Sequence, residues 1–179
     1  MSVLMADNTA PDAVWTTCYI GLGSNLSNAL GTPTEHLQRA VNAFTAHPHI
    51  QNVVASSLYQ SVPMGPQDQP DFINAAVRLE TTLSPLALLD YCQLLEQQAA
   101  RVRERHWGER SLDVDILLYG DKCIDEPRLT VPHSGLSERN FVLLPLSELG
   151  ATVLVDGQPL SNHPLANDWQ GIKRLDGAE

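Results

Sequence analysis

The chain has 179 residues, of which 43% are hydrophobic and 18% are charged, and its formal net charge is −10. The composition is that of a folded globular protein, and the length suits one domain better than two. The negative net charge argues against a nucleic-acid partner. No apolar run approaches the length of about 20 residues that spans a membrane, so we expect no membrane association either.

The first 13 residues have neither a basic start nor an apolar stretch, so they do not resemble a signal peptide. We expect them to form a mobile tail before a single domain spanning residues 14–179. The three cysteines are odd in number and form no CxxC pair, which favours free thiols in a reducing compartment. The expected protein is therefore cytoplasmic, and we expect a monomer.

The first predicted strand covers residues 14–22, which are rich in β-branched and aromatic residues. The sequence Gly21-Leu22-Gly23-Ser24-Asn25-Leu26 overlaps its end. Because leucine holds the third glycine position of the dinucleotide-binding fingerprint, we interpret this stretch as a tight turn. Thr32-Pro33-Thr34-Glu35 then has the pattern of a capping box and predicts a helix that ends near His47.

Two predicted strands follow, at residues 50–62 and 72–83, separated only by a loop rich in proline and glycine. We expect them to be antiparallel neighbours. Ser84-Pro85 begins a second helix that is predicted to reach about Arg103.

A polar loop then leads to a fourth strand at residues 111–119. The resulting order, βαββαβ, predicts a ferredoxin-like α+β fold, an antiparallel sheet with helices on one face. The C-terminal additions are an extended stretch at 128–133, a short helix at 141–149 and a hairpin at 153–160. The last fifteen residues carry no clear signal.

The strongest chemical signal is the pair Asp113 and Asp115 inside the fourth strand. Side chains alternate along a strand, so both carboxylates point to one face, roughly 7 Å apart. We expect Leu112, Val114, Ile116 and Leu118 to point to the opposite face, against the core. Two half-buried acids repel each other, whereas Mg²⁺ is bound by carboxylate and phosphate oxygens. The alternative is two ordinary acids at a solvent-facing strand end.

Basic residues cluster around this strand. Of the eleven lysines and arginines, seven lie between residues 101 and 139: Arg101, Arg103, Arg105, Arg110, Lys122, Arg128 and Arg139. Arginine binds phosphate through a planar fork of donors, so a local cluster in an acidic chain favours a small polyanionic ligand over a solvated charged face. Acids for a metal and arginines for phosphate together indicate phosphoryl transfer.

Two single residues remain open at this point. His133 lies in the basic region, where a structural role and a contact with phosphate or adenine are both reasonable. Trp107 lies beside Gly108 in a polar loop, which is unusual for a core residue and suggests that residues 104–111 form a lid over a ligand.

The chain resembles the 6-hydroxymethyl-7,8-dihydropterin pyrophosphokinase family of folate biosynthesis over about residues 17–149. The resemblance is carried by separate motifs in the same order as in the family: GLGSNL at 21–26, GPQDQPDFINAAV at 65–77, WGERSLDVDI at 107–116, RLTVPH at 128–133 and ERNFVL at 138–143. It implies a ferredoxin-like fold and transfer of pyrophosphate from ATP to the hydroxymethylpterin, giving AMP.

The resemblance also implies a role for each matching position. Asp113 and Asp115 resemble ligands of two Mg²⁺ ions, and Arg101 and Arg110 resemble arginines that bind phosphates and assist the transfer. The implied pterin-binding residues are Ser61, Met64, Phe72, Asn74 and Phe141. The implied nucleotide-binding residues are Gln93, Glu96, Arg101, Arg103, Trp107, Arg110, Ile116, Arg128, Thr130, His133 and Arg139.

The chain departs from the family pattern in three places. The loop before Trp107 is about one residue short, His106 occupies a position that is often basic, and Ser134 replaces a larger residue. These departures concern the loop and the adenine contacts. Two rival functions are a non-catalytic pterin- or nucleotide-binding regulator on the same fold and a metal-dependent phosphohydrolase.

Overall fold

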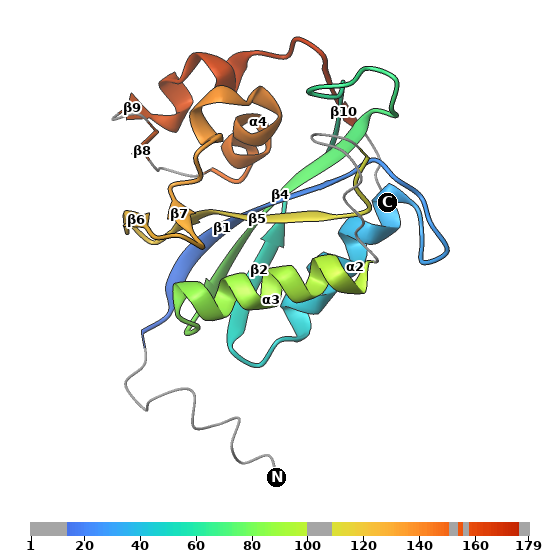
Figure 1. Ribbon diagram of the computed structural model, residues 1–179. Coiled ribbons are helices and arrows are strands. Elements are labelled where there is room, and N and C mark those ends of the chain that lie inside the picture. Colours follow the sequence, from blue (N-terminus) through green and yellow to red (C-terminus); the bar gives the residue numbers. More distant parts are fainter. Residues whose placement is uncertain (1–13, 100–108, 151–153, 156–157, 176–179) are drawn as a thin grey trace.

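The computed structural model of the chain describes residues 14–99, 109–150, 154–155 and 158–175. Its centre is an antiparallel sheet with the strand order β10-β3-β4-β1-β5, in which β2 also pairs with β4 (Figure 1). The strands are β1 (Thr16–Ser24), β2 (Ile50–Ala55), β3 (Leu58–Ser61), β4 (Phe72–Thr81), β5 (Asp113–Tyr119) and β10 (Ile172–Leu175). The predicted α+β class and the antiparallel pairing around β4 are confirmed.

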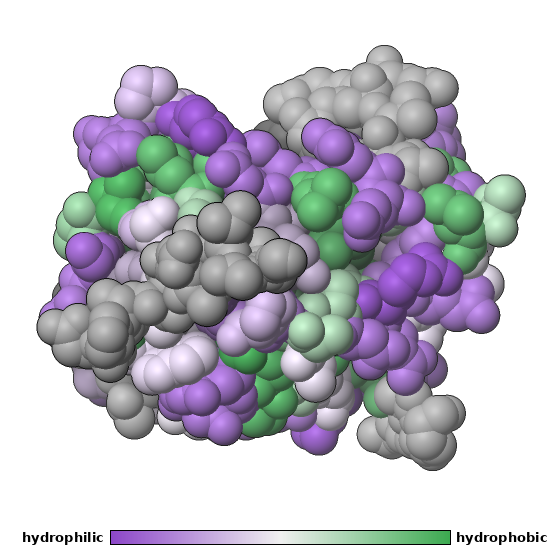
Figure 2. Space-filling model, turned by 90° about the horizontal axis from the view of Figure 1, so that it is seen from below, coloured by the Kyte–Doolittle hydropathy of each residue, from purple (hydrophilic) through white to green (hydrophobic). Residues whose placement is uncertain are grey.

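Helices α2 (Pro33–Ala46) and α3 (Pro85–Gln98) cover one face of the sheet. The predicted capping box is present, since Thr32 accepts from the amide of Glu35 and Glu35 accepts from the amide of Thr32. The main core lies between these helices and the sheet, around side chains such as Ile20, Phe44 and Leu88. Seen from this side, the surface is largely hydrophilic, with separate apolar patches (Figure 2).

The two helices of the βαββαβ unit share one face, as predicted, whereas helix α4 (Asn140–Glu148), one of the C-terminal additions, lies on the opposite face. Around it are the 3₁₀ helices η1 (Leu136–Glu138), η2 (Leu160–Asn162) and η3 (Pro164–Asn167). A second apolar cluster forms there, and it includes Ala76, Leu117 and Leu143. Since this cluster covers only part of the face, the rest is free to form a cleft.

The predicted strand at 50–62 is in fact two strands, β2 and β3, because the chain turns at Ser56 and Ser57. The Ser56 amide donates to the carbonyl of Ala76, and the Ala76 amide donates to the Ser56 hydroxyl. Ser57 instead donates to Glu148 of α4. Both halves of the segment still pair with β4.

A β-bulge in β5 overturns the predicted position of Leu118. Tyr19 pairs with Leu118 and Ile20 with Ile116, so Leu117 is an extra residue in the ladder. Beyond the bulge the alternation changes, and Leu118 joins Leu117 on the α4 side while Tyr119 packs in the main core. The residues before the bulge keep the predicted alternation.

The remaining elements are short. Strand β7 (Thr130–Val131) lies within the stretch 128–133 that was predicted to be extended, and it pairs with β6 (Ile124–Asp125), which was not predicted. Strand β8 (Leu154–Val155) pairs with β9 (Gln158–Pro159), as predicted. Strand β10, which had no sequence signal, pairs with β3. Across the described residues, no helix has the length and apolar character needed to cross a membrane.

Candidate active site

The floor of the cleft is the part of the sheet that α4 leaves open. Gly21 of β1 lies between Ala76 of β4 and Asp115 of β5, and Gly23 lies between Asn74 and Asp113. Directly paired residues of antiparallel strands point to the same face, so the two acids and the amide surround two positions that have no side chain. The floor is therefore low at its centre and polar at its sides.

The glycines do not form the tight turn that the sequence suggested. Both lie inside β1, which runs to Ser24. A Cβ atom on Gly23 would lie 3.3 Å from Oδ1 of Asn74, and one on Gly21 would lie 3.3 Å from a methyl group of Leu117. A glycine within a strand commonly marks a close approach of another group, here the contents of the cleft.

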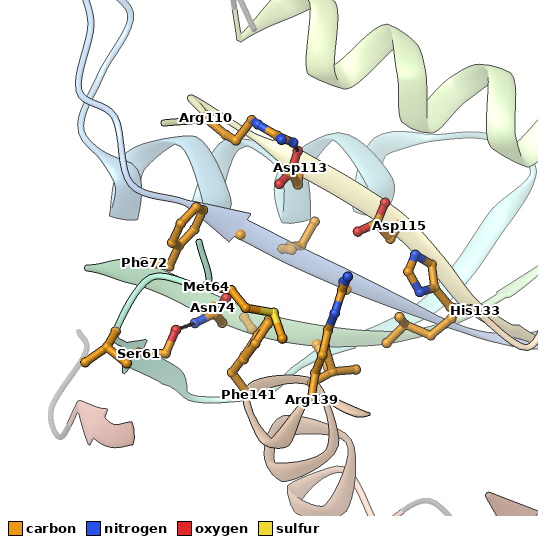
Figure 3. A pocket seen from close by; sticks show the side chains of 18 residues that line it. Ser61, Met64, Phe72, Asn74, Arg110, Asp113, Asp115, His133, Arg139 and Phe141 are labelled. Carbon is orange, nitrogen blue, oxygen red and sulfur yellow. Dashed lines mark hydrogen bonds and ion pairs between the residues drawn. The ribbon is translucent and has the colours of Figure 1, made fainter. Parts of the chain in front are cut away.

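One half of the cleft combines aromatic and amide groups. Phe72 begins β4 and Phe141 lies in the first turn of α4, on either side of the hollow (Figure 3). Between them, the buried side chain of Asn74 donates to the Ser61 hydroxyl at 2.7 Å. Met64, in the loop after β3, lines the rim. The cleft has a volume of about 290 Å³, which suits one small ligand.

The other half is charged. Asp113 and Asp115 point into it from β5, and Arg139 and His133 reach toward them from the α4 side (Figure 3). Arg110 lies 3.3 Å from a carboxylate oxygen of Asp113, and the two side chains are 9% and 26% exposed. The His133 ring accepts from the amide of Gly135 through Nδ1, which leaves Nε2 as the nitrogen that can contact a ligand.

The two halves are joined by one buried residue, Asn25. Its side-chain amide donates to Gln69 and to the carbonyl of Pro70, both at 2.9 Å, just before Phe72. Its Oδ1 accepts from the Arg110 amide at 2.8 Å, and its own amide donates to the Arg110 carbonyl at 3.0 Å. Asn25 therefore fixes the backbone of Arg110 against the loop that enters β4.

The donor set fits a magnesium ion that also binds substrate phosphates. Asp113 and Asp115 are half-buried carboxylates on one strand face, open to the cleft. In the described part of the chain, no group of three or more His, Cys, Asp or Glu side chains is placed to hold a metal. Mg²⁺ commonly takes one or two carboxylates and completes its shell with water and phosphate oxygens, so two carboxylates suffice.

A second group of predicted residues lies outside the cleft, along the outer edge of β5. Arg128 contacts Asp90 at 2.6 Å and Gln93 at 3.2 Å, and Thr130 lies nearby on β7. Glu96 accepts from the Val114 amide at 2.8 Å.

The side chain of Ile116 lies in the main core, 2% exposed, so it cannot contact a nucleotide. The backbone N–H and C=O groups of Ile116 can contact a nucleotide, because backbone groups two residues apart on a strand point the same way. The Val114 amide points away from β1, toward Glu96.

The predicted lid is only partly described. Arg101, Arg103 and Trp107 lie outside the described residues. Arg110 and Ser111, which the expected lid included, are 8% and 0% exposed, and the Arg110 amide donates to Asn25. The backbone of Arg110 is thus bonded to Asn25 at the described end of this segment. The Nε of Arg110 is buried without a hydrogen-bond partner.

Sequence reasoning did not assign functional roles to several parts of the site. The glycine floor was quoted as a motif but interpreted as a turn, and Asn25 was given no role. Gly21 and Gly23 alternate with period two inside an otherwise strand-like stretch, and this was the signal for glycines on one strand face. No local signal distinguished Asn25, because its partners are 44 to 85 residues away.

Comparison with known proteins places these residues in a family. A model of the family described as 7,8-dihydro-6-hydroxymethylpterin-pyrophosphokinase (HPPK) matches residues 19–151. A curated 2-amino-4-hydroxy-6-hydroxymethyldihydropteridine pyrophosphokinase of Haemophilus influenzae is 49% identical over 139 residues, covering 78% of this chain and 84% of that protein. The protein of the same name from Pseudomonas aeruginosa is 46% identical over 161 residues, covering 89% and 97%.

The fold is also similar to solved structures. A Plasmodium falciparum HPPK-DHPS chain, crystallised with pteroate, superposes with a TM-score of 0.67 at 14% identity. The match covers 92% of the present chain and 45% of the longer one. At this identity the similarity bears on the fold alone.

Proposed function

Since the chain belongs to the 7,8-dihydro-6-hydroxymethylpterin-pyrophosphokinase family, it transfers pyrophosphate from ATP to hydroxymethyldihydropterin, and we propose which of its residues perform each part of that reaction. The observation that carries the assignment is the arrangement of one cleft, with aromatic and amide groups at one end and two carboxylates with an arginine at the other. We propose that residues 14–179 form one functional unit.

The pterin is proposed to lie between Phe72 and Phe141. A flat heterocycle is well held between two rings, and its polar edge requires amide partners. Asn74 supplies that partner, with its orientation fixed by the hydrogen bond to Ser61. Met64 closes the rim next to the ring, and its flexible thioether adapts to the ligand.

The phosphates are proposed to lie over the carboxylate end. Asp113 and Asp115 would hold two Mg²⁺ ions, and these ions would supply positive charge against the phosphates. Arg110 supplies a fixed cation beside Asp113, and Arg101 is proposed to provide a second. His133 and Arg139 border the same space, and they are proposed to contact the nucleotide.

The nucleoside is proposed to extend along the outer edge of β5. Gln93, Arg128 and Thr130 lie there, and the outward backbone groups of Ile116 match the hydrogen-bonding edge of adenine. Glu96 braces this edge through the Val114 amide. Arg103 and Trp107 complete the nucleotide contacts in this proposal.

The chemistry requires that the hydroxymethyl oxygen attack the β-phosphorus in line with the bond to the α-phosphate. That bond breaks, AMP leaves, and the hydroxyl proton passes to solvent or a phosphate oxygen. The protein contributes position and charge: the aromatic pair directs the hydroxymethyl group toward the carboxylate end, and arginines stabilise the charge that develops on the phosphoryl oxygens. A closed cleft excludes water as a competing nucleophile.

One assay tests the proposal against both rivals. The purified protein is mixed with ATP, Mg²⁺ and the hydroxymethylpterin, and AMP and the pterin diphosphate are quantified; a parallel reaction omits the pterin. We expect equal amounts of the two products, and neither product without pterin. AMP without pterin would indicate a hydrolase, and no AMP under any condition would indicate a regulator.

Asn74→Ala tests the pterin placement within the same assay. Loss of the edge contact should raise the KM for the pterin about tenfold while the KM for ATP stays within about twofold. Asn42→Ala, on the far helix α2, is the matched control and should leave both constants unchanged.

A further inference from the structure

The C-terminal segment lies beyond the region that the family model matches, which ends at residue 151. In the structure it returns to the sheet as β10, which pairs with β3 on the side away from β4. Ile172 pairs with Ser61, a proposed pterin residue. Just before β10, residues 168–171 form a turn in which the Ile172 amide donates to the carbonyl of Trp169 at 3.0 Å.

One side of this turn is fixed to α4 by a single side chain. The amide nitrogen of Asn140 donates to the carbonyls of Asp168 at 2.9 Å and Gln170 at 3.0 Å. This uses both N–H donors of the side chain. Asn140 is the first residue of α4 and immediately precedes Phe141, one of the two proposed aromatic walls. The position of the turn is therefore coupled to the position of that wall.

The other side of the turn is fixed to β3. The Val62 amide donates to the Gly171 carbonyl at 3.1 Å, directly after Ser61. Gly171 has a φ of +75°, and a Cβ atom there would lie 3.1 Å from a methyl group of Val62, so the turn requires glycine. The Trp169 ring lies 5.9 Å from that of Tyr59, also on β3.

We infer that residues 168–171 hold the Ser61 side of the pterin pocket, on β3, against the Phe141 wall, on α4, and that Asn140 is a positioning residue for Phe141. The inference rests on the proposed placement of the pterin. Ser61 lies on β3 and Phe141 on α4, and the turn is bonded to both elements, through Val62 and Asn140. Loss of the Asn140 bonds frees the first turn of α4, so Phe141 stacks less well. Arg139, the N-cap of that turn, is affected with it, but Asp113 and Asp115 stand on β5 and the Arg110 backbone is held by Asn25, so the loss for ATP should be much smaller than for the pterin.

The test compares two asparagines with the same bonding pattern. Asn167 also donates its amide to two carbonyls, those of Ser161 and His163, but within the C-terminal segment itself. Asn140→Ala should raise the KM for the pterin about tenfold and leave the KM for ATP within about twofold, whereas Asn167→Ala should change neither. Gly171→Ala, which disturbs the turn from its other side, should act as Asn140→Ala does.

A double-mutant cycle distinguishes positioning from a general structural role. If Asn140 acts through Phe141, then in Phe141→Ala the further change Asn140→Ala should add less than about a twofold effect on pterin KM. Additive effects, equal losses for ATP and pterin, or identical behaviour of the Asn140 and Asn167 variants would overturn the inference.

Phe141→Ala alone separates this inference from the proposed pterin site. If it leaves pterin KM unchanged, the placement of the pterin fails and the inference fails with it. If it weakens the pterin while Asn140→Ala does not, only the inference fails. If Asn140→Ala does not fold, Asn140→Asp takes its place, because aspartate keeps the size of the side chain but lacks its N–H donors. The same changes in the KM for the pterin and for ATP then decide the inference.

Discussion

The two faces of the sheet are built by the same strands and yet are used in opposite ways. On the face that α2 and α3 cover, the sheet contributes apolar side chains to a continuous core. Strand β1 supplies Ile20, β4 supplies Val77 and β5 supplies Ile116, and each is no more than 2% exposed. Toward the cleft the same strands contribute glycines, an amide and two carboxylates. The alternation of side chains lets one strand do both.

The difference separates stability from activity. Burying an aliphatic side chain contributes about 1.5–3 kcal/mol, so the helix face accounts for much of the folding free energy. The cleft face gives up such burial at Gly21 and Gly23 and carries two half-buried carboxylates, which add no apolar burial. Changes on the helix face should therefore alter stability, and changes on the cleft face should alter catalysis.

The largest effect is expected for the two carboxylates. Asp113→Ala and Asp115→Ala should each lower kcat/KM at least about 1,000-fold, or about 4 kcal/mol, because a metal ligand for the transferring phosphates is lost. The melting temperature should change little. Asp125→Ala, an exposed acid on β6, is the control. Near-normal turnover in either variant would remove the metal assignment.

The converse case is a core residue of the helix face. Leu88 of α3 is fully buried, and Leu88→Ala should lower the free energy of unfolding by about 3 kcal/mol through lost burial and a cavity. At a temperature where the variant is folded, kcat/KM should match the wild type. Leu94→Ala, on the same helix but 42% exposed, should be neutral in both denaturation and kinetics. A loss of activity without loss of stability in Leu88→Ala would break the comparison.

The sequence predicts features that depend on neighbouring residues better than features that depend on distant contacts. Local patterns were sufficient for the capping box at Thr32, for the strand that carries Asp113 and Asp115, and for the βαββαβ order, because each depends on neighbours in the chain. The split of β2 from β3 depends on Ser57 bonding to Glu148, which is 91 residues away. The bulge at Leu117, the strand β10 and the role of Asn25 likewise depend on contacts that only the folded chain creates.

The site residues divide in a similar way. The structure brings Ser61, Phe72 and Asn74 into one cleft, as the family resemblance implied, together with Phe141 from a distant helix. It places Ile116 with its side chain in the core, because strand alternation points that residue away from its acidic neighbours. A motif identifies residues that lie near a ligand, whereas only the fold decides whether the side chain or the backbone faces it.

Arg110 sharpens the comparison because it is buried and yet belongs to the cleft. Arg110→Ala should lower the single-turnover rate about 100-fold, or about 2.7 kcal/mol, with ATP affinity little changed, since the arginine acts on charge that develops in the transition state. The backbone bonds to Asn25 do not involve the side chain, so the fold should persist. Arg39→Ala on α2 is the control, and a loss confined to ATP affinity would make Arg110 a binding residue only.

The aromatic wall should show a smaller and more selective effect. Phe141→Ala removes one stacking partner and should weaken pterin binding about 30-fold, or about 2 kcal/mol, with the affinity for an ATP analogue unchanged. Isothermal calorimetry with each ligand on the same variant provides its own control. Equal losses for the two ligands would place Phe141 among the structural residues of the α4 cluster.

The smallest effect concerns Glu148, which lies on the cleft side of the sheet but serves stability. It accepts hydrogen bonds from the Ser57 amide and hydroxyl and from the Tyr59 hydroxyl, and so fixes the C-terminal end of α4 to β3. Burial alone would raise the pKa of this carboxyl, but these bonds and Arg174 outweigh it, so the pKa is lowered from its usual 4.5.

Because the folded pKa lies below the unfolded one, this carboxylate stabilises the fold fully above about pH 4.5, and the contribution is lost as the pH falls through the folded value. Glu148→Gln should therefore lower the free energy of unfolding by about 1 kcal/mol at pH 7 and flatten its decline below pH 4.5, with kcat unchanged. Chemical denaturation across pH 3 to 7 measures both, with the exposed Glu126→Gln as control. If Glu148→Gln instead kept the acid sensitivity of the wild type, the pH dependence of stability would have to come from other carboxylates. The hydrogen bonds that fix α4 to β3 would then stabilise the fold without requiring the negative charge of Glu148.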